Sequence, residues 1–317
     1  MKVFLAGATG AIGRQLVPML IADGHDVTGT TRSQARAQAL TEQGAKAAVL
    51  DALDREAVHR AVAEAAPEVV IHQLTALPQR IDPRKVVRDF VLNDRLRSEG
   101  TGILVDAAQA AGAKRIVAQS VAFLYAPGPQ GTVHREQDRL LTESPKSFER
   151  TARAVRELEQ IVLGAGGLVL RYGYFYGPGT AIAPEGSIGE DLRRRRFPIV
   201  GGGTGVWSLI HIEDAARATR ATIKQGESGA YNVVDDHPAR VSEWLPALAE
   251  AIGAPKPMRV PAWIARLVAG SYGASVMTSA QGASNEKAKR ELGWEPRYSH
   301  WREGFAHAFE TSATGVD

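Results

Sequence analysis

A glycine-rich turn near the N-terminus constrains the fold of this chain more than any other feature. Residues 3–6 form a short apolar run, Gly7-Ala8-Thr9-Gly10-Ala11-Ile12-Gly13 follows at once, and an amphipathic helix is expected from about Ala11 to residue 23. A strand, a turn with this glycine spacing and a helix form the phosphate-binding corner of a Rossmann domain, where free N–H groups and the helix dipole attract phosphates. We therefore expect a dinucleotide site that includes Gly7, Thr9, Gly10, Ala11, Ile12 and Gly13.

The pattern through residue 172 indicates the rest of this domain. Short β-branched runs alternate with helical patterns, which is typical of βαβ units around a parallel sheet. We expect an α/β fold with a Rossmann-type doubly wound parallel sheet. Its expected strands are 3–6, 26–30, 47–50, 68–72, 115–118, 168–171 and, returning later, 231–234, and its expected helices are 33–43, 55–64, 86–111 and 148–163.

Two parts are expected along the chain. Residues 1–172 should form the NAD(P)-binding Rossmann domain, with 208–238 returning to it. Glycine, proline and aromatic residues dominate 173–207, and short helices are expected at 241–252 and 261–269. Because so many chain breakers argue against further sheet layers, we expect 173–207 and 239–317 to form a smaller substrate-binding lobe.

Charge and composition narrow the possible partners. The chain has 38 Lys and Arg against 35 Asp and Glu, a net charge of +3, which is too small an excess to indicate nucleic acid. The lack of cysteine excludes disulfides, thiolate metal sites and a cysteine nucleophile, and we expect no metal. With neither a leader pattern nor a run of 18 apolar residues, we expect a cytoplasmic protein that does not enter a membrane.

The end of the second expected strand bears on the type of dinucleotide. A carboxylate there favours NAD, whereas an arginine favours NADP. This chain reads Thr30-Thr31-Arg32-Ser33, and a guanidinium pairs well with a 2′-phosphate. Arg14, next to the third glycine, is expected to close over the same group. We therefore predict NADP(H) in preference to NAD(H).

Further residues are expected around the cofactor. Asp51, followed by Ala52 and Leu53 after the third strand, lies where an adenine amine is expected. The alternative role for Asp51 is to cap the next helix, which suits Asp54 better. Other expected contacts come from the ends of later strands: Leu74, Thr75, Ser120 and Tyr172.

Taken together, several segments resemble the extended short-chain dehydrogenase/reductases, or NAD-dependent epimerase/dehydratases, over nearly the full length. Beyond the glycine turn, the resemblance rests on Val-Val-Ile-His at 69–72, Glu-Gly-Thr at 99–101, Leu-Arg-Tyr-Gly-Tyr-Phe-Tyr-Gly-Pro-Gly at 170–179, Ile-His-Ile-Glu-Asp-Ala at 210–215 and Ala-Lys-Arg-Glu-Leu-Gly-Trp at 288–294.

The resemblance implies a catalytic pattern that this chain does not keep. The family uses a Ser or Thr after strand five and, on the next helix, a Tyr and a Lys four residues apart. Glu159 resembles the glutamate that follows the family lysine by four residues, which puts Thr151 at the tyrosine position and Val155 at the lysine position. Val121 falls at the Ser/Thr position, with Ser120 beside it. The chain resembles an atypical member without the Tyr-x-x-x-Lys pair.

Other side chains are candidates for proton transfer. Tyr174, Tyr125 and Ser120 fall on segments that flank the nicotinamide in this fold, and His134 is a further acid or base. The alternative for both tyrosines is plain packing. Trp207 stands near the place where nucleotide-sugar members tend to have an arginine, which makes a nucleotide sugar a poorer substrate. With the tyrosines at 174 and 176, it indicates an aromatic-lined pocket.

Three functions remain open on the sequence. The first is an NADPH-dependent oxidoreductase that acts on a small, fairly apolar carbonyl or hydroxyl compound. The second is an isomerase, epimerase, lyase or cyclase on the same scaffold, and the third is a non-enzymatic NADP(H) sensor. Alanine-rich faces on helices 86–111 and 148–163, through which the family commonly dimerises, predict a homodimer, although internal packing explains these alanines equally well.

Overall fold

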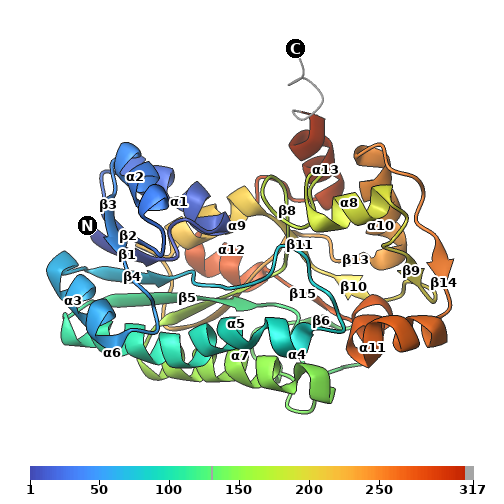
Figure 1. The fold of residues 1–317 in the computed structure, drawn as a ribbon, viewed down its shortest axis with the longest axis horizontal. Coiled ribbons are helices and arrows are strands. Elements are labelled where there is room, and N and C mark those ends of the chain that lie inside the picture. Colours follow the sequence, from blue (N-terminus) through green and yellow to red (C-terminus); the bar gives the residue numbers. More distant parts are fainter. Residues whose placement is uncertain (130, 311–317) are drawn as a thin grey trace.

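The computed structural model describes residues 1–129 and 131–310 and contains a seven-stranded, fully parallel sheet at its centre (Figure 1). The strand order is β12-β7-β5-β4-β1-β2-β3. Strands β2 and β3 lie on one side of β1 and the later strands on the other, which confirms the doubly wound prediction. The strands are β1 (Lys2–Ala6), β2 (Asp26–Thr31), β3 (Lys46–Val49), β4 (Val69–His72), β5 (Arg115–Val121), β7 (Leu168–Tyr172) and β12 (Gly229–Val233).

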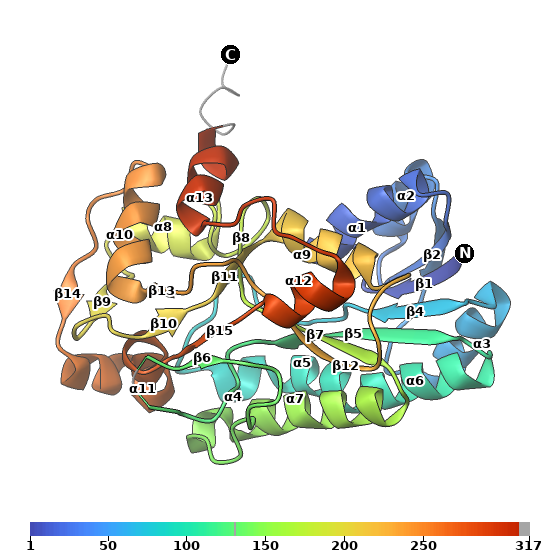
Figure 2. The same cartoon turned by 180° about the vertical axis from the view of Figure 1, so that it is seen from behind.

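Helices cover both faces of this sheet, as the mostly apolar central strands require (Figures 1 and 2). One core packs α1 and α9 against the sheet, and a second core packs α6 and α7 against the opposite face. The first layer holds α1 (Ala11–Ala22), α2 (Gln34–Glu42), α9 (Ile212–Ala221) and α12 (Glu286–Leu292), and the second holds α3 (Arg55–Ala65), α6 (Thr101–Ala110) and α7 (Lys146–Gly164).

The long helix predicted for residues 86–111 is interrupted, so that prediction was wrong in detail. The chain instead forms α4 (Val86–Asp89), α5 (Val91–Arg95), a π-helical segment η1 (Leu96–Gly100) and then α6. At Phe90, between α4 and α5, the backbone has φ −93° and ψ 0°, outside the α-helical region. Wider π turns inside helices often occur at functional sites, which makes η1 a segment of interest.

The C-terminal half forms a smaller lobe with its own core, in which Trp207, Trp244 and Phe305 are buried. In α11, Gly270 adopts φ +76° and interrupts the helix midway. The lobe contains α8 (Ser187–Arg193), β9 (Ile199–Val200), β10 (Val206–Trp207), β13 (Ala239–Arg240), α10 (Val241–Ala251), β14 (Arg259–Val260), α11 (Ala262–Thr278) and α13 (Trp301–Glu310).

One segment assigned to the lobe from sequence packs elsewhere. In α12, Ala288 and Leu292 are buried with Trp294 in the core beneath α1 and α9. The apolar side of this short helix lies against the nucleotide-binding half, because β12 brings the chain back to that sheet. Residues 286–294 therefore belong with the Rossmann part.

Among the residues that the structure describes, four small strand pairs lie outside the central sheet, and two of them include the strands that follow β5 and β7. The first pairs β8 (Tyr174–Tyr176) with β11 (Leu209–His211), and the second pairs β6 (Val133–His134) with β15 (Gly282–Ala283). They hold the loops after β5 and β7 near the chain segments that enter the lobe (Figure 2).

The helices also bear on two sequence predictions. Within the described ranges, no helix is both long enough and apolar enough to cross a bilayer.

Four of the alanines that suggested a dimer are buried inside the monomer: Ala107, Ala108, Ala152 and Ala154. Internal packing therefore explains them, and the homodimer stays a prediction.

Candidate functional site

The glycine turn has the geometry that a dinucleotide phosphate site requires. Gly7 has φ +93°, and a Cβ there would lie 2.6 Å from the carbonyl oxygen of Gln73. A Cβ at Gly13 would overlap the carbonyl of Ala8, so only glycine lets α1 pack this close to the turn. Gly10 begins α1 without a side-chain cap, which leaves the first N–H groups of the helix for phosphate oxygens. These residues fit the cofactor expected from the sequence.

The end of β2 offers a cation and no carboxylate. Thr30 Oγ1 accepts a hydrogen bond of 3.0 Å from the N–H of Gly7, which ties the turn to β2. Thr31 is buried, and its hydroxyl accepts from the N–H of Ser33. Arg32 follows on the surface with an exposed side chain. Its guanidinium is the charged group that an adenosine ribose would meet at this strand end.

The other predicted cofactor contacts divide into surface and buried groups. The Asp51 carboxylate accepts from the N–H of Leu53 at 3.0 Å, and Asp54 caps α3 by accepting from Ala57. Ala52 is buried, whereas Thr75 is exposed and Leu74 is partly exposed.

Two predicted contacts are placed differently from the expectation. The side chain of Tyr172 is 1 % exposed, and its hydroxyl bonds to Gln73 and Thr219. A side chain enclosed in this way positions Gln73, and its contact with a cofactor stays a prediction. Arg14 lies against Gly179, in the loop after β8, because its guanidinium is 3.0 Å from where a Gly179 Cβ would stand. It is therefore placed on the loop side of α1.

The face of α7 that carries the proton-transfer pair in the resembling family is mostly apolar here. Val155 is buried in a cluster with Phe90, Leu124 and Phe148. The Thr151 hydroxyl is also buried and donates to Asp94 Oδ2 at 3.1 Å. Neither position offers a phenol or an amine, so this helix supplies no proton relay of the usual kind.

A polar network with nearly all of its hydrogen bonds made fills the space between α7 and the ends of β5, β7 and β12. Arg171 donates to both carboxylate oxygens of Glu159, at 2.9 and 2.6 Å, and to the Tyr125 hydroxyl at 2.9 Å. Ser120 donates to Glu159 at 2.6 Å, and Tyr125 donates to Asn232 at 2.6 Å. Burial lowers the pKa of Arg171, but Glu159 outweighs burial and raises it. We call this network the Glu159–Arg171 cluster. Its hydrogen bonds join α7 to β5 and β7, which indicates a structural role.

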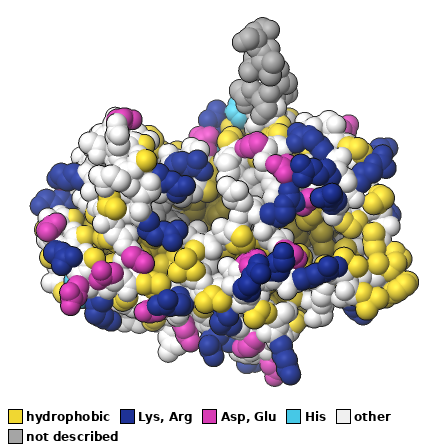
Figure 3. All heavy atoms as spheres, viewed as in Figure 1, with side chains coloured by type: hydrophobic (Ala, Val, Ile, Leu, Met, Phe, Trp, Pro, Cys, Tyr) yellow, Lys and Arg dark blue, Asp and Glu magenta, His cyan; other side chains and the backbone are white. Residues whose placement is uncertain are grey.

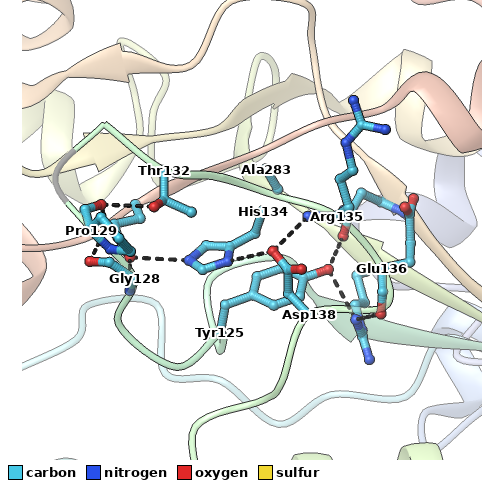
Figure 4. A network of polar contacts seen from close by, with 12 residues as sticks. Tyr125, Gly128, Pro129, Thr132, His134, Arg135, Glu136, Asp138 and Ala283 are labelled. Carbon is cyan, nitrogen blue, oxygen red and sulfur yellow. Dashed lines mark hydrogen bonds and ion pairs between the residues drawn. The ribbon is translucent and has the colours of Figure 1, made fainter.

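The same loop holds His134, the remaining candidate acid or base (Figure 4). Its ring stacks on Tyr125 at 4.7 Å, and its nitrogens contact Asp138 at 2.9 Å and Gln281 at 3.1 Å. Burial raises the pKa of Tyr125 to about 12. With their polar atoms already bonded, Ser120, Tyr125 and His134 are poorly placed to exchange protons with a ligand.

Tyr174 differs from these three groups. Its ring stacks between Phe123, at 4.5 Å, and Trp207, at 3.8 Å, and we call these three the aromatic stack. No described residue hydrogen-bonds its hydroxyl, and burial, with Tyr272 nearby, raises its pKa well above the usual value. The face of the molecule seen in Figure 3 is hollowed near its centre, with apolar side chains inside the hollow and Lys and Arg side chains around it.

A second buried polar cluster, which the sequence did not predict, lies at the ends of β4 and α5. Asn93, Asp94 and Arg97 are 0, 3 and 8 % exposed. Within the described part of the chain, Asn93 Nδ2, Asp94 Oδ1, Arg97 Nε and Gln73 Oε1 are buried without a hydrogen-bond partner. Buried polar groups are nearly always satisfied, so orphaned atoms at these neighbouring positions single out the cluster as a candidate ligand site.

A signal for this cluster was present in the sequence. Residues 93, 97, 101 and 104 share one helix stripe by their spacing, and in the structure Leu104 lies in the core. Asn, Arg and Thr occupy the other three places on this buried stripe. Polar residues at inward positions of a helix indicate a polar site, even where no motif names it.

Comparison with known proteins gives a family match and two relatives that are named as reductases. Residues 3–234 match the model of the NAD dependent epimerase/dehydratase family. A 3-diazoavenalumate denitrifying reductase from Streptomyces sp. is 44% identical over 309 residues, covering 96% of this chain and 99% of that protein. A 4-hydroxy-2-methyl-3-oxo-4-farnesyl-3,4-dihydroquinoline-1-oxide ketoreductase from Stigmatella aurantiaca is 25% identical over 95% of this chain and 93% of its own length.

Solved structures show the same fold. A UDP-glucose 4-epimerase from Thermotoga maritima, determined with UDP-glucose, has a TM-score of 0.80 at 20% identity, covering 100% of both chains. A UDP-glucose 4-epimerase from Thermus thermophilus, in complex with NAD, has a TM-score of 0.74 at 24% identity, also over 100% of both chains. At these identities the likeness is one of architecture.

Proposed function

Since the chain belongs to the NAD-dependent epimerase/dehydratase family, within the extended short-chain dehydrogenase/reductases, and is an NAD(P)-dependent enzyme of oxidoreductase or epimerase/dehydratase type, we propose a specific activity. The protein is an NADPH-dependent reductase that replaces the diazo group of a small aromatic compound by hydrogen and releases N2.

The observation that carries this proposal is the α7 face with Thr151 and Val155. Reduction of a carbonyl needs a proton on oxygen, which the family's Tyr and Lys supply. Replacement of a diazo group needs none: the ring carbon gains hydrogen with its electron pair while N2 leaves with the pair of the C–N bond. A reductase for this reaction functions without a tyrosine at 151 and a lysine at 155.

The substrate class follows from the pocket and from the reductase relative. The aromatic stack of Phe123, Tyr174 and Trp207 presents ring faces suited to a flat aromatic substrate. The Streptomyces relative is named as a denitrifying reductase of a diazo compound, and its identity of 44% extends over almost the whole chain. These two points together favour an aromatic diazo compound over a sugar.

For the cofactor we propose NADPH, which supplies the hydride when bound. The N–H groups at the start of α1 hold the pyrophosphate, and Arg32 pairs with the 2′-phosphate. Arg32→Glu should weaken NADPH binding roughly 10- to 100-fold and NADH binding little, the usual effect of a lost charged hydrogen bond. Arg60→Glu, an equally exposed change on α3, is the matched control. Kd values in which NADH binds the wild type tenfold more tightly than NADPH would overturn this preference.

The proposed reaction is tested by supplying NADPH with a panel of arenediazonium salts and matched aryl ketones. We expect NADPH oxidation and one N2 for each NADPH consumed with the diazonium salts, measured by absorbance and mass spectrometry. Gly10→Val, which blocks the approach of the pyrophosphate, serves as the background control because diazonium salts react slowly with NADPH unaided. Turnover of the ketones without turnover of any diazonium salt contradicts the proposal.

A second candidate is carbonyl reduction with Tyr174 as the proton donor. It is favoured by the Tyr174 hydroxyl, which lacks a described hydrogen-bond partner, and by the ketoreductase relative. Against it, no described cation lowers the pKa of Tyr174, which burial raises. Tyr174→Phe separates the two candidates: ketone reduction by this route would be lost, whereas diazo reduction keeps its kcat.

A further inference from the structure

Arg97, on the π-helical segment η1, is a buried cation without a partner. The residue is 8 % exposed. Among residues 1–129 and 131–310, its guanidinium makes no hydrogen bond, and no carboxylate oxygen lies within 4.0 Å of it. Because an uncompensated buried charge is costly, such an arginine is kept for a reason other than folding.

The groups around Arg97 do not neutralise it. Asp94 attracts the guanidinium, but its Oδ2 already pairs with Arg150 at 2.8 Å and accepts from Thr151. His72 is held neutral, because burial and the charge of Arg97 lower its pKa to about 4. Tyr272 also faces Arg97, and burial raises the pKa of this phenol, so it stays uncharged. One positive charge is therefore left over in this space.

Arg97 lies beside the site already described. Asp94, one turn before Arg97, accepts a hydrogen bond from Thr151 on the α7 face. Tyr272 stacks on Phe148 of α7 at 3.9 Å and is near enough to influence the pKa of both Arg97 and Tyr174. Gln73, whose Oε1 is also an orphan, contacts the glycine turn through its carbonyl oxygen. Arg97 thus lies near the α7 face that carries Thr151 and near Tyr174 of the aromatic stack.

We infer that Arg97 binds an anionic oxygen of the aromatic substrate, a phenolate or a carboxylate on the ring. A guanidinium presents several N–H donors in one plane, which suits such oxygens, and a low-dielectric site strengthens the pairing. The inference rests on the proposed function only for the group that reacts. The binding of an anionic oxygen is argued from the unpaired guanidinium of Arg97. In this role Arg97 determines specificity, and neutral aromatic compounds are poor ligands.

Binding in the presence of NADP⁺ tests this inference without turnover. We use calorimetry with two anionic probes, benzoate and ionised 4-nitrophenol, and their neutral counterparts, benzamide and 4-nitroanisole. We expect Arg97→Gln to weaken the preferred anionic probe roughly 10- to 100-fold and to leave neutral probes unchanged, as for a lost hydrogen bond to a charged group. The stronger of the two anionic probes identifies phenolate or carboxylate as the partner.

Two further variants keep the test sharp. Arg95→Gln removes an exposed arginine that lies two residues before Arg97 and pairs with Glu99. This change should leave the binding of all four probes as in the wild type. Arg97→Lys keeps the charge without the planar fork and should give intermediate binding. Equal loss of anionic and neutral probes in Arg97→Gln, or a weakened Kd for NADPH, overturns the inference.

Turnover distinguishes this inference from the proposed function. If no diazonium salt is reduced but anionic probes bind through Arg97, the recognition site stands and the proposed reaction fails. If N2 is released but Arg97→Gln reduces 4-carboxybenzenediazonium and its carboxamide with unchanged KM values, the reaction stands and the role of Arg97 fails.

Discussion

The two buried polar clusters of this protein differ in how completely their hydrogen bonds are made. In the Glu159–Arg171 cluster, both carboxylate oxygens of Glu159 are bonded, Ser120 and Tyr125 donate to neighbours, and Asn232 Nδ2 is the one buried atom without a described partner. At the ends of β4 and α5, Asn93, Asp94 and Arg97 each retain a buried atom without a described partner. A satisfied cluster stabilises the fold, whereas an unsatisfied one gives up stability to receive a ligand.

Breaking the satisfied cluster should give the largest effect. Glu159→Ala leaves Arg171 buried without its carboxylate, and we expect the free energy of unfolding to fall by about 3–5 kcal/mol. Urea denaturation followed by circular dichroism measures this loss. A loss below about 1 kcal/mol, typical of an exposed ion pair, would contradict the structural role of the cluster.

Lowering the pH should reduce the free energy of unfolding through His72, which lies beside Arg97. Burial lowers the His72 pKa from 6.5 to about 4 in the folded protein. Below pH 6.5 the unfolded chain binds a proton that the folded protein refuses, so stability is complete above pH 6.5 and is lost as the pH falls towards 4. The slope from this group is at most about 1.4 kcal/mol per pH unit. Denaturation across this range should be less pH-dependent for His72→Gln; identical slopes would disprove the assignment.

A smaller change in the satisfied cluster separates support from catalysis. Tyr125→Phe removes the hydroxyl that bonds Arg171 and Asn232, and should cost about 1–3 kcal/mol of stability. We expect kcat to stay within twofold of the wild type, measured where both proteins are folded. Loss of activity without loss of stability would restore Tyr125 as a proton donor.

The smallest effect on stability is expected at Arg97. Arg97→Met removes an unpaired buried charge, so the free energy of unfolding should stay within about 1 kcal/mol of the wild type or rise. Urea denaturation of the ligand-free protein measures it against Arg95→Met. A loss of several kcal/mol would mean that Arg97 has a structural partner, and the contrast between the two clusters would disappear.

The sequence predicted those parts of the molecule that short-range rules determine. Gly7 and Gly13 are required by local backbone geometry, so their spacing identified the turn and with it the sheet. Glu159 was located by its resemblance to a family position, but its bonds to Ser120 and Arg171 join three separate elements and needed the fold.

The orphaned cluster was not predicted, for a physical reason. Whether Arg97 is unpaired depends on Asp94 being taken by Arg150, which lies 56 residues later on α7. Periodicity reports which face of a helix is buried, and it does not report which charges cancel. The break between α4, α5 and η1 was missed likewise, because the helical pattern continues through Phe90.

The central claim is that hydride reaches the aromatic ring without a proton from α7. The most direct test supplies NADPH deuterated at C4 and 4-carboxybenzenediazonium in ordinary water, and analyses the aromatic product by mass spectrometry and NMR, with the Gly10→Val background subtracted. The account predicts one deuterium at the carbon that carried the nitrogen, for each N2 released. A product that keeps both nitrogens, or that has lost them without gaining deuterium, would contradict it.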